Sequence, residues 1–187
     1  MGTLDLVVKQ GKALYAGVSS YPGDLFRYAV EVIRRHDWTP LTIHQPSYNL
    51  LRRTVESDLL PHTGLAGTGV IAFCPLAQGL LTDRYLYGLP PDSRMGRRGP
   101  EGQAWWEKQK AAGVWDKAAK LNQIAAARGQ SLAQMALAWI LRLPGITSAL
   151  VGVSSARQLE QNLAALGNLK FSEEELKGID DITLSRP

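Results

Sequence analysis

The chain of 187 residues is 45% hydrophobic and 20% charged, with a formal net charge of +4 at pH 7, a composition typical of globular proteins that argues against disorder. Its arginines are scattered and form no long basic stripe, so a nucleic-acid surface is not expected. No run of about 18 apolar residues and no secretory leader stand out, so we expect one domain over residues 1–187, in the cytoplasm and away from membranes.

Four short apolar runs predict β-strands, over residues 13–20, 41–46, 69–76 and 149–155. Strands that are buried on both faces read as continuous apolar runs, which is typical of parallel sheets covered by helices. The predicted fold class is therefore α/β, with about four parallel strands and flanking helices, like one half of a (β/α)8 barrel. In such barrels the groups that bind ligands gather at the carboxyl ends of the strands.

Helical segments separate these strands. Residues 3–10 carry an apolar side and end at Gly11, which suggests that the chain starts partway through a fold. Residues 21–24 predict a turn and cap, followed by a helix over 25–35. A further helix is expected near 55–60, and Pro61, Gly64 and Gly67 predict a short or irregular continuation.

The second half of the chain is mainly helical. Residues 86–103 are rich in glycine, proline and arginine and predict an ordered surface loop. Helical patterning follows over 105–113 and 114–128, and Ser131 is placed to cap a helix over 132–141. Ser155 is placed to cap a helix over 156–166, and Ser172 begins a last helix that continues through Ile179.

The side chains at the predicted strand ends suit a nicotinamide cofactor. Gln45 supplies an amide, Phe73 an aromatic face, and Ser19 and Ser20 supply hydroxyl groups. Ser154, Ser155 and Gln158 lie where a strand passes into a helix, and a helix N-terminus with such donors can bind phosphate. Cys74 is the only cysteine and is expected to pack at a strand end, and the histidines lack the spacing of metal ligands, so no metal is expected.

Each of these residues also has a structural interpretation. Ser19 and Ser154 would be ordinary strand ends, Gln45 would satisfy buried backbone, and Phe73 would belong to the core. The arginines of the loop, Arg84, Arg94, Arg97 and Arg98, fit a solvated surface as well as a phosphate clamp, although the planar guanidinium group suits phosphate.

Four motifs, over residues 17–20, 44–51, 73–82 and 152–162, together resemble the aldo-keto reductases, in the order in which that family carries them. The similarity covers nearly the whole chain. It is closest to the branch of L-glyceraldehyde 3-phosphate reductases and potassium-channel β subunits. The resemblance implies the C-terminal half of a (β/α)8 barrel that binds NADP(H), and hydride transfer to the carbonyl carbon of a small aldehyde or ketone.

The resemblance also implies a role for each cofactor-binding residue. Ser19 and Gln45 would hold the carboxamide with Ser20 beside them, and Phe73 would stack on the nicotinamide ring. A second set of residues would contact the adenosine and phosphate groups: Pro75, Leu76, Ala77 and Gly79 at the pyrophosphate, Arg84 and Arg94 from the loop, Gly152, Ser154 and Gln158 near the 2′-phosphate, and Gln161 and Asn162 at the adenine. At the position of Gln161 the family often has glutamate.

No catalytic residue is predicted in this chain. In the family, the aspartate, tyrosine, lysine and histidine tetrad lies in the first half of the barrel, and its motifs are absent here. Tyr21 and Tyr48 lie near the sheet edge where the predicted cofactor-binding residues are found, yet neither has a lysine partner. We therefore expect no reduction by this chain alone, because a positioned acid is missing.

Four strands cannot close an eight-stranded barrel, so a partner is expected at the open edges. The chain is either a fragment of a longer or split gene product, a half that pairs with a second copy, or a half completed by a separate N-terminal chain. A non-catalytic module that senses NADP or binds another protein is the alternative function.

Overall fold

The computed structural model describes residues 1–184. Backbone contacts divide the chain into two compact units, and each is described by itself. Unit 1 comprises residues 1–75 and 143–151, and unit 2 comprises residues 76–142 and those from 152 onward. None of the helices in the described part is long and apolar enough to cross a membrane.

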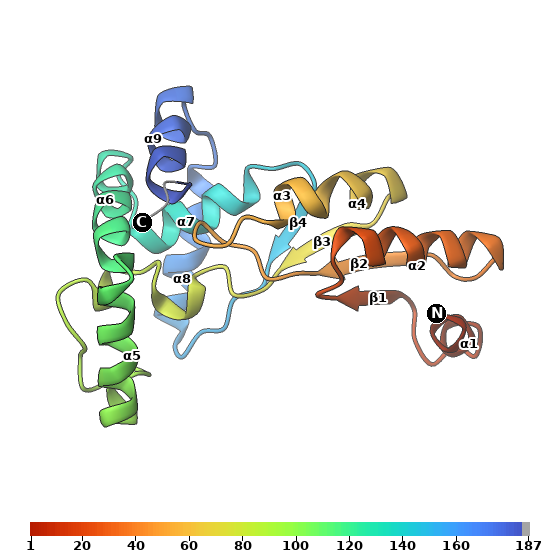
Figure 1. The fold of residues 1–187 in the computed structure, drawn as a ribbon, viewed down its shortest axis with the longest axis horizontal. Helices are drawn as coiled ribbons and strands as arrows, with labels where there is room; N and C mark the ends of the chain where they lie inside the picture. Colours follow the sequence, from red (N-terminus) through yellow and green to blue (C-terminus); the bar gives the residue numbers. More distant parts are fainter. Residues whose placement is uncertain (185–187) are drawn as a thin grey trace. The chain divides into compact units, whose positions relative to one another are not determined.

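Unit 1 is built on one sheet of four parallel strands in the order β1-β2-β3-β4 (Figure 1). The strands are β1 (Ala16–Ser19), β2 (Leu41–Gln45), β3 (Gly69–Ala72) and β4 (Ile146–Ala149). Because all strands are parallel and adjacent, their carboxyl ends lie at one edge of the sheet. The α/β fold class and the four parallel strands are thus as predicted, and the architecture is that of half a (β/α)8 barrel.

The fourth strand is misplaced in the sequence prediction. It was expected over 149–155, but the pairing with β3 runs from Val70↔Ile146 to Ala72↔Ala149. The Leu150 N–H still donates to the Ala72 carbonyl at 2.8 Å. Beyond Ala72 the third strand keeps only an isolated parallel bridge, between Phe73 and Ser47 on its β2 side, and residues 151–155 form no strand.

The helices of unit 1 are α1 (Gly2–Lys9), α2 (Gly23–Arg35), α3 (Val55–Asp58) and α4 (Leu60–Ala66). Helix α2 buries Phe26, Ala29 and Ile33. The expected cap at 21–24 is wrong in detail: Asp24 lies inside α2, and the Gly23 N–H donates instead to the Asp58 carboxylate at 3.0 Å. Pro61 does not disrupt the segment after α3, because it lies in the first turn of α4, where its missing N–H has no helical partner to lose.

Unit 2 is helical. Its α-helices are α5 (Pro100–Ala111), α6 (Val114–Ala127), α7 (Leu132–Leu141), α8 (Ala156–Leu163) and α9 (Glu173–Thr183), with 3-10 turns η1 (Ala77–Gly79), η2 (Asp83–Tyr85), η3 (Gly96–Arg98) and η4 (Ala164–Gly167). Helix α7 forms the core of the unit, with seven buried residues: Leu132, Met135, Ala136, Leu137, Ala138, Trp139 and Ile140. Ser131 and Ser172 are the N-caps of α7 and α9, as predicted, while α8 ends three residues earlier than expected.

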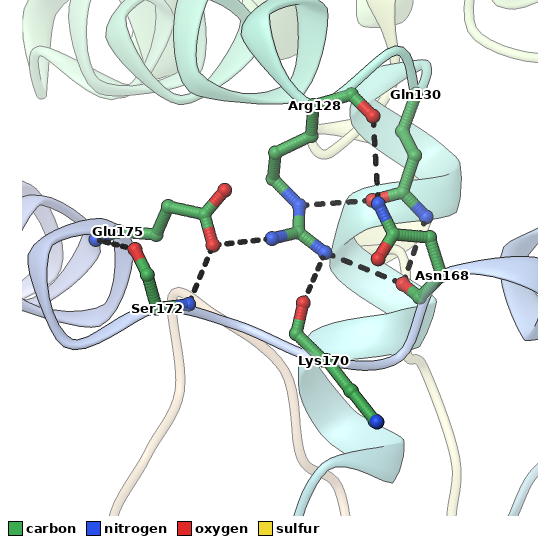
Figure 2. A network of polar contacts seen from close by, with 6 residues as sticks. All are labelled: Arg128, Gln130, Asn168, Lys170, Ser172 and Glu175. Atoms are coloured by element: carbon green, nitrogen blue, oxygen red, sulfur yellow. Dashed lines mark hydrogen bonds and ion pairs between the residues drawn. The ribbon is translucent and has the colours of Figure 1, made fainter.

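A buried guanidinium fastens the start of α9 to the end of α6 (Figure 2). The Arg128 side chain is 2% exposed and forms an ion pair with Glu175. It also donates to the carbonyl of Lys170 at 2.9 Å and to the Gln130 side chain at 3.0 Å. The ring of Phe171 lies 3.7 Å from the guanidinium carbon. Arg128 thus replaces its hydration shell with partners from the segment that leads into α9.

Glu175 is the anionic end of this network. Burial by itself would raise the pKa of Glu175, but the Ser172 N–H, which donates at 2.7 Å, and the Arg128 guanidinium together lower it below the ordinary 4.5. A carboxyl group whose pKa is lower in the folded than in the unfolded protein stabilises the fold above the unfolded pKa. That stabilisation is lost as the pH falls through the lowered pKa.

We therefore predict that Glu175→Gln, which keeps the shape but removes the charge, lowers the free energy of unfolding at pH 7 by about 1–2 kcal/mol. The difference from wild type should shrink as the pH falls from the ordinary glutamate pKa through the lowered pKa, because Glu175 is protonated first in the unfolded chain and then in the folded chain as well. Urea unfolding between pH 7 and pH 3 measures this. Glu174→Gln, at an exposed neighbour, is the control, and equal losses in both variants at every pH would contradict the role of Glu175.

Candidate functional site

Ser19, Ser20 and Gln45 come together at the carboxyl ends of β1 and β2. Ser19 and Gln45 are register partners in the sheet. The Ser19 hydroxyl donates to the Gln45 carbonyl at 2.8 Å, and the Ser20 N–H donates to the same carbonyl at 3.1 Å. The Gln45 side-chain amide forms no hydrogen bond with another residue among those described, so its donor and acceptor are free for a ligand.

Phe73 follows β3 at the same edge of the sheet. Its N–H donates to the Pro46 carbonyl at 2.9 Å, and its carbonyl accepts from the Tyr48 N–H at 3.3 Å. These two bonds fix the backbone of Phe73 beside the end of β2. Its side chain is partly exposed, so the ring is not ordinary buried core.

Two residues at this edge have a backbone conformation that is unusual outside glycine. Ser20 follows β1 with φ of 59°, and Cys74 follows Phe73 with φ of 53°. The left-handed region costs about 1–3 kcal/mol for such residues and is often found at functional sites. The Cys74 carbonyl accepts from the Asn49 side chain at 3.0 Å, which helps to hold the turn.

His44 and Tyr48, which adjoin the predicted residues, are structural. His44 is fully buried, packs edge-on against Phe26 with ring centroids 5.4 Å apart, and its Nε2 lies 3.1 Å from the Tyr21 carbonyl. Burial lowers the pKa of His44 more than this contact raises it, so the ring is neutral at pH 7. The hydroxyl of the fully buried Tyr48 donates to Glu56 at 2.6 Å and is not presented to a substrate.

Unit 2 contains a polar pocket of about 400 Å³. Six of its lining residues belong to the predicted cofactor-binding set: Leu76, Arg84, Ser154, Gln158, Gln161 and Asn162. The remaining ones are Thr82, Asp83, Ser131, Ala133, Gln134 and Ser155. The pocket is thus lined mainly by hydroxyl and amide groups.

The N-terminus of α8 forms one wall of this pocket. Ser155 is the N-cap, and its hydroxyl accepts from the Gln158 N–H at 3.2 Å. The Gln158 side-chain oxygen accepts from the Ser154 N–H at 2.8 Å and from the Ser154 hydroxyl at 3.2 Å. The Nδ2 of Asn162 is buried and has no hydrogen-bond partner among the described residues, so it is a donor without an acceptor.

Arg84 supplies positive charge to the pocket and is held from the surface loop. Its guanidinium pairs with Asp92 at 2.8 Å, and both side chains are exposed. An exposed ion pair contributes little to stability, so Arg84 can exchange Asp92 for a phosphate at small cost. The loop itself is ordered by Ser93, which is fully buried and whose hydroxyl donates to the Pro90 carbonyl at 2.6 Å.

The other predicted residues do not line the pocket. Arg94 and Gly152 are exposed, and Pro75 is a buried residue of unit 1. Ala77 and Gly79 lie in the tight turn η1. The sequence analysis did not place Thr82, Asp83, Ala133 or Gln134 at the site, and it recognised Ser131 only as a helix cap. For Ser131 and Gln134, the S-x-x-Q capping pattern was the available sequence signal.

A second hollow, of about 310 Å³, lies on the helical side of unit 1. Its lining residues come from α2 and α4 and include Arg27, Arg34, His62 and Leu65. None of the predicted cofactor-binding residues lies there. No group of histidine, cysteine and acidic side chains that could hold a metal ion occurs within residues 1–184.

Residues 1–183 match the model of the aldo/keto reductase family. Together with the parallel sheet and the residues at its carboxyl edge, this match shows that the chain belongs to the aldo/keto reductase family.

Reductases and potassium-channel subunits are among the proteins similar to this chain. The L-glyceraldehyde 3-phosphate reductase of Escherichia coli (strain K12) is 50% identical over 175 residues, which are 92% of this chain and 50% of the relative. The probable voltage-gated potassium channel subunit beta of Oryza sativa subsp. japonica is 32% identical over 187 residues, 98% of this chain and 56% of the relative. The putative voltage-gated potassium channel subunit beta of Schizosaccharomyces pombe is 30% identical over 178 residues, which are 94% of this chain and 52% of the relative. The chain spans about half the length of the curated relatives it matches.

Gly79 provides a test of the turn that leads into the pocket. Its φ is +100°, and a Cβ there would lie 2.8 Å from the ring of Tyr85, which is itself buried against Trp105. We predict that Gly79→Ala lowers the free energy of unfolding by about 1–3 kcal/mol, measured by urea denaturation. Gly167→Ala, where a Cβ meets no atom within 4 Å, is the control, and similar losses in the two variants would contradict this account of the turn.

Proposed function

We propose that this chain is the NADP(H)-binding half of an aldo-keto reductase that reduces small aldehydes or ketones in the cytoplasm, and that it is active only together with an N-terminal half. The observation that carries the proposal is the unit 2 pocket, where six predicted cofactor-binding residues meet. Membership of the family and the similarity to L-glyceraldehyde 3-phosphate reductases support it.

The pocket of unit 2 fits the phosphate and adenosine end of the cofactor. Its volume of about 400 Å³ lies in the range of small-molecule sites. Ser154 and the N-terminus of α8 offer donors to phosphate oxygens, and Arg84 adds a guanidinium group. The buried Nδ2 of Asn162 lacks an acceptor, which a ring nitrogen of a purine would provide.

The strand ends of unit 1 fit the nicotinamide end. Because the Ser19 hydroxyl hydrogen is used by the Gln45 carbonyl, Ser19 would accept a hydrogen bond from the carboxamide nitrogen. The free amide of Gln45 would bind the carboxamide oxygen, and the ring of Phe73 would stack on the nicotinamide ring. When bound, the cofactor supplies a hydride for a carbonyl carbon.

In this proposal, the group that donates the proton is not one of the residues of this chain. Reduction of a carbonyl places negative charge on its oxygen, and a positioned acid normally stabilises this charge and delivers the proton. The hydroxyl of Tyr48 donates its hydrogen bond to Glu56, and the residue is fully buried. The acid would come from an N-terminal half, either on the same polypeptide or on a separate chain.

The test is co-expression with the N-terminal half of the Escherichia coli L-glyceraldehyde 3-phosphate reductase. We expect the purified complex to oxidise NADPH in the presence of a small aldehyde, and each half alone to show no turnover. Replacing Gln45 with leucine should lower the rate at least tenfold, whereas Gln123→Glu, at an exposed position of α6, should not.

A folded complex that neither binds NADPH nor reduces aldehydes would contradict the proposal. A folded complex that binds NADPH without turnover would instead support a non-catalytic NADP-sensing or interaction module, which the similarity to potassium-channel β subunits makes the second candidate.

A further inference from the structure

Gln134 links two helices that line the unit 2 pocket, and the proposed cofactor site did not include it. We propose that Gln134 is a positioning residue, which holds the last turn of α8 so that Asn162 presents its side-chain amide to the adenosine end of the cofactor. This inference rests on the proposed function.

The side-chain amide of Gln134 is used at both ends. Its oxygen accepts from the Ser131 N–H at 2.9 Å, which completes the capping box of α7. Its nitrogen donates to the Gln161 carbonyl at 2.9 Å. An amide turned the other way would place NH2 against N–H and oxygen against oxygen, so the two contacts together fix its orientation.

The hydrogen bond from Gln134 reaches α8 at its C-terminal end. Gln161 lies in the last turn of α8, where backbone carbonyls lose their helical partners. The next residue, Asn162, carries the buried and unpartnered Nδ2. Anchoring the carbonyl of Gln161 therefore sets the backbone from which this donor projects.

One substitution separates the capping role of Gln134 from its positioning role. Gln134→Glu keeps an oxygen for the Ser131 N–H, and glutamate is as good as glutamine at this place in a capping box. It also replaces the donor to Gln161 with an oxygen that faces the carbonyl oxygen. Helix α7 should therefore stay capped while the anchor of α8 is lost. Gln123→Glu makes the same change of charge at an exposed position of α6 and controls for net charge. The Asn162→Ala background controls for direct repulsion of the ligand by the new carboxylate, because that repulsion would persist there whereas loss of positioning would not.

The experiment uses the full 187-residue chain labelled with ¹⁵N and titrated with 2′,5′-ADP. We expect Gln134→Glu to move the side-chain amide resonances of Asn162 in the free protein and to weaken 2′,5′-ADP binding about threefold to tenfold, while the melting temperature stays near that of wild type. In an Asn162→Ala background, the same substitution should have little further effect on binding, because the two residues act together.

Unmoved Asn162 resonances and an unchanged affinity in Gln134→Glu would overturn the inference, as would equal effects from Gln123→Glu. A wild-type chain that does not bind 2′,5′-ADP would contradict the proposed cofactor site instead. The Asn162 resonances of the free protein would still decide whether Gln134 positions this residue.

Discussion

Parallel pairing of the four strands is the constraint on which the rest of unit 1 depends. It brings the carboxyl ends of β1, β2 and β3 to one edge, although Ser19, Gln45 and Phe73 are far apart in the sequence. Hydrogen bonds between strand ends then hold each backbone, as the Ser19 hydroxyl and the Ser20 N–H do on the Gln45 carbonyl. These bonds use the backbone carbonyl of Gln45, while its side-chain amide has no protein partner among the described residues, which makes this edge suitable for a ligand.

Unit 2 also presents polar groups to a possible ligand, but its pocket is formed by helix termini and side-chain amides. Ser155 and Ser131 cap α8 and α7, and both line the pocket. Arg84, in η2, brings positive charge to the pocket, and its ion-pair partner Asp92 lies in the loop beside the buried Ser93. The ion pair of Arg128 with Glu175 lies elsewhere in the unit and fixes the entry to α9. The residues of the Arg128 network are thus distinct from those that line the pocket.

Sequence patterns predicted much of this arrangement because local rules decide it. The starts of α7 and α9 follow from the capping serines Ser131 and Ser172, each with glutamine or glutamate three residues later. The fourth strand was placed too late, since the position of a strand depends on where its neighbour stops pairing, and β3 stops at Ala72. The capping pattern marks Gln134 as a helix-cap residue, but its contact with Gln161 joins segments 27 residues apart, which no local pattern predicts.

The central proposal is that this chain binds a nicotinamide nucleotide, to which the carboxyl edge of the sheet in unit 1 and the pocket at α8 in unit 2 would each supply contacts. Mapping the amide chemical shifts of the ¹⁵N-labelled chain during titration with NADPH tests it most directly. The account predicts saturable shifts at Ser19, Gln45 and Phe73 and also at Ser154, Gln158 and Asn162. Shifts confined to other places, such as the hollow formed by α2 and α4, or no shifts at saturating NADPH, would contradict it.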